Sequence, residues 1–304
     1  MIKIAVVTDS SAYLPNSALA GLDVSVIPLW LLWDKDRFRD GVDIDPPTFY
    51  RRLAQSKTLP TTSQPSPDEF ATHFQSVSAQ ADAIVGVLVS SQISGTIASA
   101  QAAQLQLPEL TIQIVDSLSC SMGLGLMVLA AARAAKAGGS LDDVVGAAQE
   151  MCDKMHLLFA VDTLEYLHRG GRISGVKRMV GTALKIKPIL HFREGRIEQL
   201  SQARTKRKAL THMLEIAEER LGGTGMAEVA VLDIDASDEG DAFAELVQER
   251  FAPPIMHRSG VSPVVGAHVG PGTIGMAFYA ASWDPHATGY MGKDSRKPIP
   301  LAPF

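Results

Sequence analysis

Residues 83–106 read AIVGVLVSSQISGTIASAQAAQLQ and contain a strand, a turn and a helix in direct succession. The apolar run Ala83–Val89 predicts a buried strand, and the alanine-rich segment after Thr96 predicts a helix to about Gln106. The turn between them, Ser90–Thr96, is rich in hydroxyl groups. The first amides of a helix have no partner inside the helix and lie at its positive end. This turn is therefore suited to a carboxylate or a phosphate.

The same alternation of strand and helix extends from residue 3 to residue 155. Lys3–Val7 is an apolar strand followed by Thr8-Asp9-Ser10-Ser11, and Thr111–Val115 is another, followed by Asp116-Ser117. Such alternation predicts a parallel, doubly wound sheet covered by helices on both faces. We therefore expect an N-terminal three-layer α/β/α domain over residues 1–160, with Ser, Thr and Asp side chains at one edge of its sheet.

The pattern changes after Leu157. Strands at Lys187–His191 and Arg196–Leu200 flank Arg193-Glu194-Gly195, which indicates a hairpin. The chain length of 304 residues also fits two domains better than one. We expect a C-terminal mixed α/β domain over residues 161–283, a tail over residues 284–304, and a ligand bound between the two domains.

Residues 261–278 read VSPVVGAHVGPGTIGMAF and place His268 among glycines and prolines. This density of glycine and proline predicts a bend with close backbone approaches, which would hold His268 at the edge of a strand. The apolar run Ile274–Ala281 predicts that strand. Nearer the N-terminus, Val24–Trp33 is expected to be one strand and Asp34–Asp45 a loop.

Composition excludes several classes of function. The net charge of −5 does not fit a chain built to bind nucleic acid or an anionic membrane. Cys120 and Cys152 are too far apart for CxxC chemistry, and the eight histidines show no metal-ligand spacing, so we expect reduced thiols, no metal and no cofactor. We expect a cytoplasmic protein, because the sequence has neither a signal peptide at its start nor an apolar run of membrane-spanning length.

Four polar sites are candidates for binding or catalysis: Thr62-Ser63, Ser94-Gly95-Thr96, Arg172 and His268. Each also has a structural explanation. Thr62 is compatible with a helix-entry residue, Ser94 with a helix N-cap, Arg172 with a solvated loop charge, and His268 with a hydrogen-bonded structural histidine. Their order along the chain is what favours a function.

That order resembles the DegV family. The motifs are VTDSS at 7–11, TSQPSP at 62–67, SSQISGT at 90–96, LEYLHRGGRIS at 164–174, IKPIL at 186–190 and SPVVGAHVGPGTIG at 262–275. Together they cover about residues 3–281 in order. The tail after residue 284 and the tryptophan-rich run Trp30–Trp33 are departures from the family pattern.

This resemblance implies a two-domain protein, not itself an enzyme, that buries one long-chain fatty acid. It also implies a partner, an ATP-dependent fatty acid kinase, to which the acid is presented for acyl-phosphate formation. The implied site residues are the carboxylate-binding hydroxyls Thr62 and Ser94, the interdomain His268, and Arg172 and Arg204 for partner docking and phosphoryl transfer. We extend the expected carboxylate set to Ser63, Gly95, Thr96 and His268, and we also expect His268 to act with the two arginines in phosphoryl transfer.

The residues themselves agree with this expectation. Hydroxyls and helix amides would hold a carboxylate without a buried cation, which leaves it available as a nucleophile. The acyl chain would need an apolar tunnel, with walls from the helix after Thr96 and from Met122–Ala132; burial contributes roughly 0.8 kcal/mol per CH₂. Residues 169–208 are rich in Lys and Arg and form a local basic face for an acidic partner or transient membrane contact, unless they are only solvated surface.

Other classes fit less well. Ser94 and His268, with Asp9 or Asp116, would make a serine carboxylic ester hydrolase, yet the sequence has no GxSxG elbow. Gly170–Gly175 has the glycine spacing of a phosphate loop, but Val176 follows where a Walker lysine would stand. The basic segment also lacks the interleaved aromatic residues that stack on bases, which argues against nucleic-acid binding.

Overall fold

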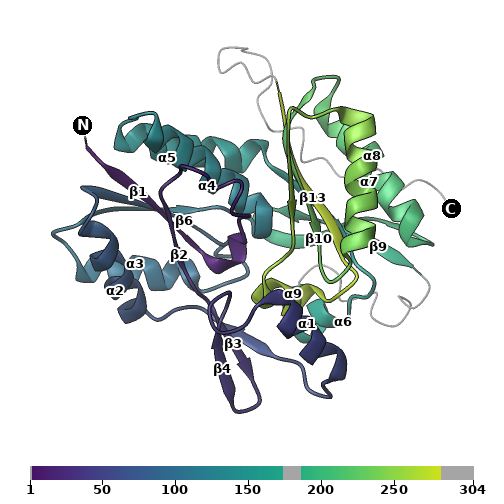
Figure 1. Cartoon of the computed structure of the whole chain (residues 1–304), viewed down its shortest axis with the longest axis horizontal. Coiled ribbons are helices and arrows are strands. Elements are labelled where there is room, and N and C mark those ends of the chain that lie inside the picture. The colour runs from purple at the N-terminus through teal and green to yellow at the C-terminus, as the bar shows by residue number, and fades with distance from the viewer. Residues whose placement is uncertain (1, 174–185, 282–304) are drawn as a thin grey trace. The chain divides into compact units, whose positions relative to one another are not determined.

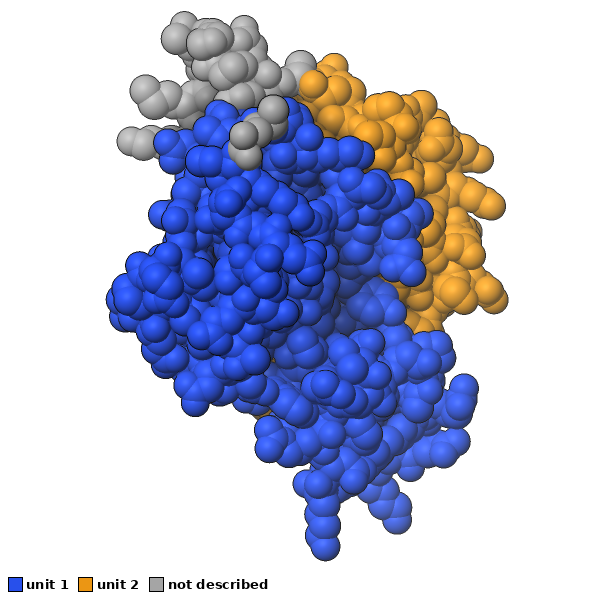
Figure 2. Space-filling view, turned by 60° about the vertical axis from the view of Figure 1, so that its left-hand side comes forward, with its two compact units in different colours: residues 1–152, 261–267 blue, residues 153–260, 268–304 orange. Residues whose placement is uncertain are grey.

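The computed structural model describes residues 2–173 and 186–281, and the chain divides into two compact units (Figures 1 and 2). Unit 1 holds residues 1–152 and 261–267, and unit 2 holds residues 153–260 and 268 onwards. A segment near the end of the chain thus returns to the first unit. The expected tail over residues 284–304 lies outside the described residues.

A four-stranded parallel sheet forms the centre of unit 1. Its order is β2-β1-β6-β7, with β1 at Ile4–Asp9, β2 at Val24–Ile27, β6 at Ala83–Leu88 and β7 at Thr111–Asp116. β1 and β6 are buried along their whole length, as expected for strands covered on both faces. Helices α2 (Pro67–Ser78) and α3 (Thr96–Gln106) pack on one face, and α4 (Ser121–Lys136) and α5 (Leu141–Lys154) lie on the other (Figure 1). The predicted parallel, doubly wound sheet is confirmed.

A second, antiparallel sheet in unit 1 was not expected. Its order is β4-β3-β5, with β3 at Trp30–Trp33, β4 at Asp36–Arg39 and β5 at Thr61–Ser63, and α1 (Pro46–Gln55) follows β4. The prediction of one strand over residues 24–33 is wrong, because Pro28 and Leu29 separate β2 in the parallel sheet from β3 in the antiparallel one. Proline has no N–H to donate to a ladder. The prediction of a loop over residues 34–45 is also wrong, since β4 lies within it and Asp34 turns the hairpin with a φ of 56°.

Packing against two helices explains the tryptophan-rich run. Trp33 is fully buried, packs at a tilt against Phe49 of α1 with 5.4 Å between ring centroids, and has the Arg52 guanidinium 4.5 Å above its ring. Trp30 lies under the Arg37 guanidinium, 4.7 Å away, and donates to Glu69 of α2 at 2.9 Å. The two indoles therefore fasten β3 to α1 and α2, the next two helices along the chain.

A six-stranded mixed sheet forms unit 2. Its order is β10-β9-β8-β13-β11-β12, with β8 at His156–Ala160, β9 at Lys187–Arg193, β10 at Arg196–Ala203, β11 at Met226–Asp233, β12 at Ile255–Ser259 and β13 at Ile274–Ala280. All neighbours are antiparallel except β11 and β12. Helices α7 (Lys206–Leu221) and α8 (Ser237–Phe251) bury their apolar sides against this sheet. The predicted hairpin is confirmed: β9 and β10 are joined by Glu194 and Gly195, whose φ angles of 49° and 79° suit a tight two-residue turn.

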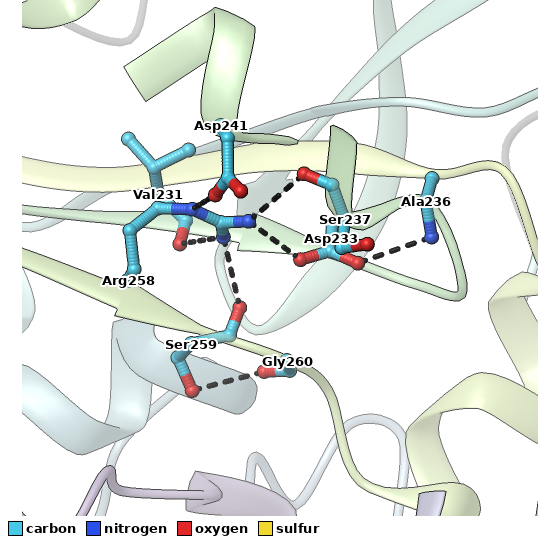
Figure 3. A network of polar contacts seen from close by, with 8 residues as sticks. All are labelled: Val231, Asp233, Ala236, Ser237, Asp241, Arg258, Ser259 and Gly260. Atoms are coloured by element: carbon cyan, nitrogen blue, oxygen red, sulfur yellow. Dashed lines mark hydrogen bonds and ion pairs between the residues drawn. The ribbon is translucent and has the colours of Figure 1, made fainter. Parts of the chain in front are cut away.

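Arg258 of β12 ties this sheet to α8 (Figure 3). Its guanidinium donates to Asp241 at 2.8 Å, to Asp233 at 2.9 Å and to the Val231 carbonyl at 3.1 Å. A Cβ on Gly240 of α8 would lie 2.6 Å from Arg258 Nη2, so the guanidinium occupies the space that the glycine leaves. This network fixes the start of α8 over the ends of β11 and β12.

The surroundings of His268 differ from the prediction. His268 lies in the last turn of α9 (Pro263–Val269), and not at a strand edge. Ser262 Oγ accepts from the Val265 amide at 3.4 Å at the start of this helix, and Gly270, with a φ of 87°, follows its end. Proline at the first helical position and glycine after the last are helix boundaries, and the prediction treated them as bends. The strand predicted at 274–281 is confirmed as β13.

Within residues 2–173 and 186–281, none of the helices has the length and apolar character needed to cross a membrane.

Candidate functional site

The turn before α3 presents a pair of hydroxyl groups. Ser94 Oγ and Thr96 Oγ1 lie 2.8 Å apart, and the Thr96 amide donates to Ser94 Oγ at 3.3 Å. The amides of Ile93 and Ser94 both donate to the Ser90 carbonyl, at 3.2 and 3.1 Å, which fixes the turn. Gly95 is the N-cap of α3 and supplies no side-chain acceptor to the first amides. The alternative explanation of Ser94 as the N-cap of this helix is therefore wrong, because the N-cap is Gly95.

Gln64 brings the segment with Thr62 and Ser63 to this turn. Thr62 and Ser63 lie on β5, opposite Leu31 and Trp30 of β3. The next residue, Gln64, lies over Gly95 so closely that a Cβ on Gly95 would be 2.9 Å from Gln64 Nε2. The predicted residues 62–63 and 94–96 thus belong to one neighbourhood in unit 1. Sequence reasoning missed Gln64, although it stands inside the TSQPSP motif.

The side chains proposed to hold an anion here are neutral: two hydroxyls of the α3 turn, two of β5 and the Gln64 amide, which lies at the start of the 11-residue α3. The Asp116 carboxylate beside the same turn is already bound by the Ser91 amide. Neutral donors at the positive end of a helix favour an anion and add no cation of their own. The arrangement can hold a carboxylate through hydrogen bonds alone.

His268 and Arg172 come together within unit 2. The imidazole lies against the backbone of Gly170, where a Cβ would be 2.2 Å from His268 Nδ1. Arg172 donates to the Gly170 carbonyl at 2.7 Å, and its amide donates to Leu167 at 3.2 Å. Burial, and then the positive charge of Arg172, lower the pKa of His268 to about 4. His268 is therefore a neutral imidazole at pH 7.

Arg204 is exposed between β10 and α7. The next residue, Thr205, caps α7 by accepting from the Lys208 amide at 3.3 Å. Part of the basic segment is neutralised locally, since Lys187 pairs with Asp162 at 2.7 Å and Lys206 pairs with Glu239. The other basic residues predicted at 177, 178 and 185 lie outside the described residues.

The two carboxylates considered for a hydrolase serve the loops of unit 1. Asp9 is fully buried and accepts from the Ser11 amide at 3.0 Å, from Ser11 Oγ at 2.5 Å and from the Val89 amide at 2.7 Å. Asp116 accepts from the Ser91 amide at 3.2 Å and from the Leu118 amide at 3.0 Å. Both hold the polar turns at the carboxyl ends of the parallel strands.

A buried carboxyl group that sequence reasoning missed anchors the segment 261–267 in unit 1. Asp40 accepts from Ser10 Oγ at 2.6 Å, and Ser10 Oγ accepts from the Leu29 amide at 3.0 Å. Burial raises the pKa of Asp40 to about 7, against the lowering effect of Ser10, Ser262 and the Val264 amide. Asp40 lies in a charged stretch of sequence, and nothing in that stretch marks it as the buried member.

No group of three or more His, Cys, Asp or Glu side chains in the described part of the chain is arranged to hold a metal ion.

A parallel α/β unit with a hydroxyl turn, followed by a mixed α/β unit with a half-buried His–Arg pair, defines the class of protein. A family model described as "Uncharacterised protein, DegV family" matches residues 3–281, and the chain belongs to this family. It is 37% identical over 276 residues to a DegV domain-containing protein of Streptomyces coelicolor, covering 90% of this chain and 97% of that protein.

Two solved structures are similar to the chain over their full length. A DegV family protein from Thermus thermophilus, described by its fatty acid binding, is 32% identical with a TM-score of 0.86, covering 92% of this chain and 100% of that chain. DegV from Bacillus subtilis, described as a fatty acid binding protein, is 31% identical with a TM-score of 0.84 and the same coverage.

Proposed function

We propose that this protein binds one long-chain fatty acid and presents its carboxylate to an ATP-dependent fatty acid kinase. The observation that carries the proposal is the Ser94–Thr96 hydroxyl pair at the start of α3, with Gln64 over Gly95. The fatty acid binding of the Thermus thermophilus and Bacillus subtilis relatives supports the class of ligand. In this proposal Thr62, Ser63, Ser94, Gly95 and Thr96 surround the carboxylate.

The neutral donors suit the reaction of the partner. A carboxylate held by an arginine or lysine would share its charge with that cation and attack phosphorus less readily. Hydroxyl and amide donors fix the orientation and leave most of the negative charge on the oxygens. One oxygen then forms a bond to the γ-phosphorus of ATP, the bond from that phosphorus to the β-phosphate oxygen breaks, and ADP leaves.

Unit 2 supplies the polar groups proposed for transfer. Because its pKa is lowered to about 4, His268 donates or accepts a hydrogen bond at pH 7 without adding a charge. Arg172 and Arg204 carry the positive charge, which favours their assignment to the transferring phosphate and to docking of the partner.

Helix α4 is suited to line the acyl chain. Nearly all of its residues from Ser121 to Ala132 are buried, and most of them are apolar. Because burial contributes roughly 0.8 kcal/mol for each CH₂ group, we expect affinity to follow chain length until the available space is filled.

A serine ester hydrolase is a weaker proposal for the same residues. In such an enzyme a carboxylate stabilises the protonated histidine. Burial and Arg172 both act in the opposite direction on His268, lowering its pKa to about 4. The electrostatics around His268 therefore favour a neutral hydrogen-bonding role.

The first experiment is mass spectrometry of an organic extract of the purified protein. We expect one long-chain fatty acid per chain, and loss of most of it in Ser94→Ala. Ser91→Ala is the matched control, because Ser91 is an exposed hydroxyl of the same turn. An extract free of fatty acid, together with no change in melting temperature when fatty acids are added, would refute the binding proposal.

The second experiment separates binding from presentation. Lipid-loaded protein is mixed with a fatty acid kinase subunit and ATP, and acyl-phosphate is trapped as the hydroxamate. Arg204→Gln is expected to keep the fatty acid and lose most of the product, whereas Arg51→Gln, an exposed arginine of α1, keeps both. If lipid binds and no product forms with the unchanged chain, presentation is refuted and binding stands.

A further inference from the structure

A second basic cluster lies in unit 2, where Arg220 of α7 meets two histidines of the sheet. Arg220 Nη1 lies 3.5 Å from Nδ1 of His156, and Nη2 lies 3.3 Å from Nδ1 of His191. His156 starts β8 and His191 lies on the adjacent strand β9, opposite Leu158. Since residues 156 and 158 share a face of β8, both imidazoles lie on the face that α7 covers.

This cluster holds a positive charge without a matching carboxylate. The partners that Arg220 has among the described residues are the two imidazoles, and neither carries a negative charge. The nearby Arg193 is paired with Glu198 at 3.8 Å. Glu219, next to Arg220 in α7, acts on the charge of Arg220 and raises its pKa, but its side chain is exposed and forms no ion pair with Arg220 among the described residues. Largely buried arginines are normally paired with acids, because an uncompensated charge in a low-dielectric site is costly.

The pKa values of the three groups also indicate one positive charge and two neutral imidazoles. Burial lowers the pKa of Arg220 to about 10, and it still carries its charge at pH 7. Burial and then Arg220 lower the pKa of His156 to about 3 and that of His191 to about 4. Burial, and then the positive charge of Arg220, therefore keep both imidazoles neutral, so the guanidinium is the one charged group of the cluster.

All three residues are partly accessible. Because a guanidinium only donates, two of its N–H groups bind the imidazole Nδ1 atoms, and the other N–H groups of the planar fork and the Nε2–H of each neutral imidazole remain as donors. Donors from three side chains around one positive charge suit a small tetrahedral oxyanion. The C-terminal end of α7 offers only about half a negative charge, which does not replace such an anion.

We propose that Arg220, His156 and His191 form a binding site for a tetrahedral oxyanion, either inorganic phosphate or the phosphate group of a small phosphate monoester. The site consists of residues of unit 2 alone and does not depend on the proposed fatty acid. The negative charge of a bound anion favours the protonated form of both imidazoles, so anion affinity and the pKa values of the two histidines are coupled.

Calorimetry with sulfate tests this directly, because sulfate stays a dianion between pH 5.5 and pH 7.5. We expect its affinity to rise as the pH falls, by up to about tenfold per pH unit for each proton taken up. Arg220→Gln is expected to weaken binding at least about tenfold, whereas the matched charge control Arg51→Gln leaves it unchanged. Inorganic phosphate and glycerol 3-phosphate, compared in the same way, distinguish the free ion from the monoester.

A measurement on the unchanged chain guards against misfolding of the variant. Sulfate must raise the pKa values of His156 and His191, followed by NMR of their ring protons, and leave the other imidazoles unaffected. The proposal is overturned if sulfate at 10 mM, taken as about ten times a millimolar Kd, moves neither resonance. It is also overturned if Arg220→Gln folds and binds sulfate as tightly as Arg51→Gln does.

Discussion

Replacing Gly170 by alanine tests the placement of His268. The new Cβ would lie 2.2 Å from His268 Nδ1 and 3.1 Å from the Tyr166 carbonyl. The φ of Gly170 is −71°, which alanine adopts without strain, so the contact alone decides the outcome. The ring would have to move by roughly 1 Å, and overpacking of this size costs about 1–3 kcal/mol.

A second glycine gives the matched control. Gly146 lies inside α5, and a Cβ there would meet no atom within 4 Å. Alanine stabilises a helix interior by roughly 0.5–1 kcal/mol relative to glycine. The same chemical change is therefore expected to have opposite signs at the two positions, with Gly170→Ala destabilising and Gly146→Ala stabilising.

Urea unfolding measures the stability of both variants, and NMR titration of His268 reports whether the ring has moved. A ring displaced from Gly170 toward solvent regains part of its ordinary pKa, because burial is the larger of the two causes of its lowering. The reasoning fails if Gly170→Ala is as stable as Gly146→Ala and His268 still titrates near pH 4. In the kinase assay, the displaced ring should reduce product more than it reduces bound fatty acid.

Three further predictions concern buried charge. Because the pKa of Asp40 in the folded protein is raised to about 7, this group lowers the free energy of unfolding as the pH rises from 4 to 7. Asp40→Asn should remove this pH dependence, which is worth at most about 4 kcal/mol. Identical dependences of the urea midpoint on pH for the two proteins would contradict this. Arg258→Met should lower the free energy of unfolding in urea by about 3–5 kcal/mol, because it leaves the buried Asp233 carboxylate without its cation. Arg250→Met removes a more exposed ion pair, with Glu218, and should cost under about 1 kcal/mol. Equal losses in the two variants would refute this difference. The folded pKa values of His156 and His191, about 3 and 4, lie below the ordinary 6.5, so their contribution is complete above pH 6.5 and is lost as the pH falls toward 4. Replacing both by glutamine should flatten the fall in melting temperature between pH 6.5 and pH 4.5, and an unchanged fall would show that other groups cause it.

Much of the fold could be predicted because its signals are local. Ala83–Leu88 is apolar and bounded by polar residues, and it is a buried strand. Ser66-Pro67-Asp68-Glu69 predicts a capping box, and the Ser66 amide donates to Glu69 Oε2 at 2.7 Å while the Glu69 amide donates to Ser66 Oγ at 3.2 Å. Such patterns depend on residues a few positions apart, so one sequence is enough to identify them.

The features that could not be predicted from the sequence depend on contacts between distant parts of the chain. Residues 24–33 are apolar except for Ser25, and only the pairing of β3 with β5 shows that two sheets share this run. Asp40 is one acid in a charged stretch, and its burial follows from contacts with Ser10 and Ser262. Gln64 is ordinary in sequence and gains its position from Gly95, which lies on a different element. The hydrophobic periodicity of the sequence does not indicate such long-range contacts.

The glycines of the family motifs illustrate the same limit. The glycine density of residues 261–278 predicted bends, and Gly270 and Gly272 do have a positive φ, but Gly266 does not. Gly95 and Gly170 of the other motifs also have no positive φ. What Gly95, Gly170 and Gly266 provide is space: a Cβ would meet Gln64 at 2.9 Å, the His268 ring at 2.2 Å and the Tyr50 hydroxyl at 2.1 Å, respectively. Each missing Cβ lets a polar side chain from elsewhere in the chain rest directly on the backbone, where a larger residue would push it away. A motif glycine therefore points to an approaching side chain as often as to a turn, and for Gly95 and Gly170 that side chain belongs to the candidate site.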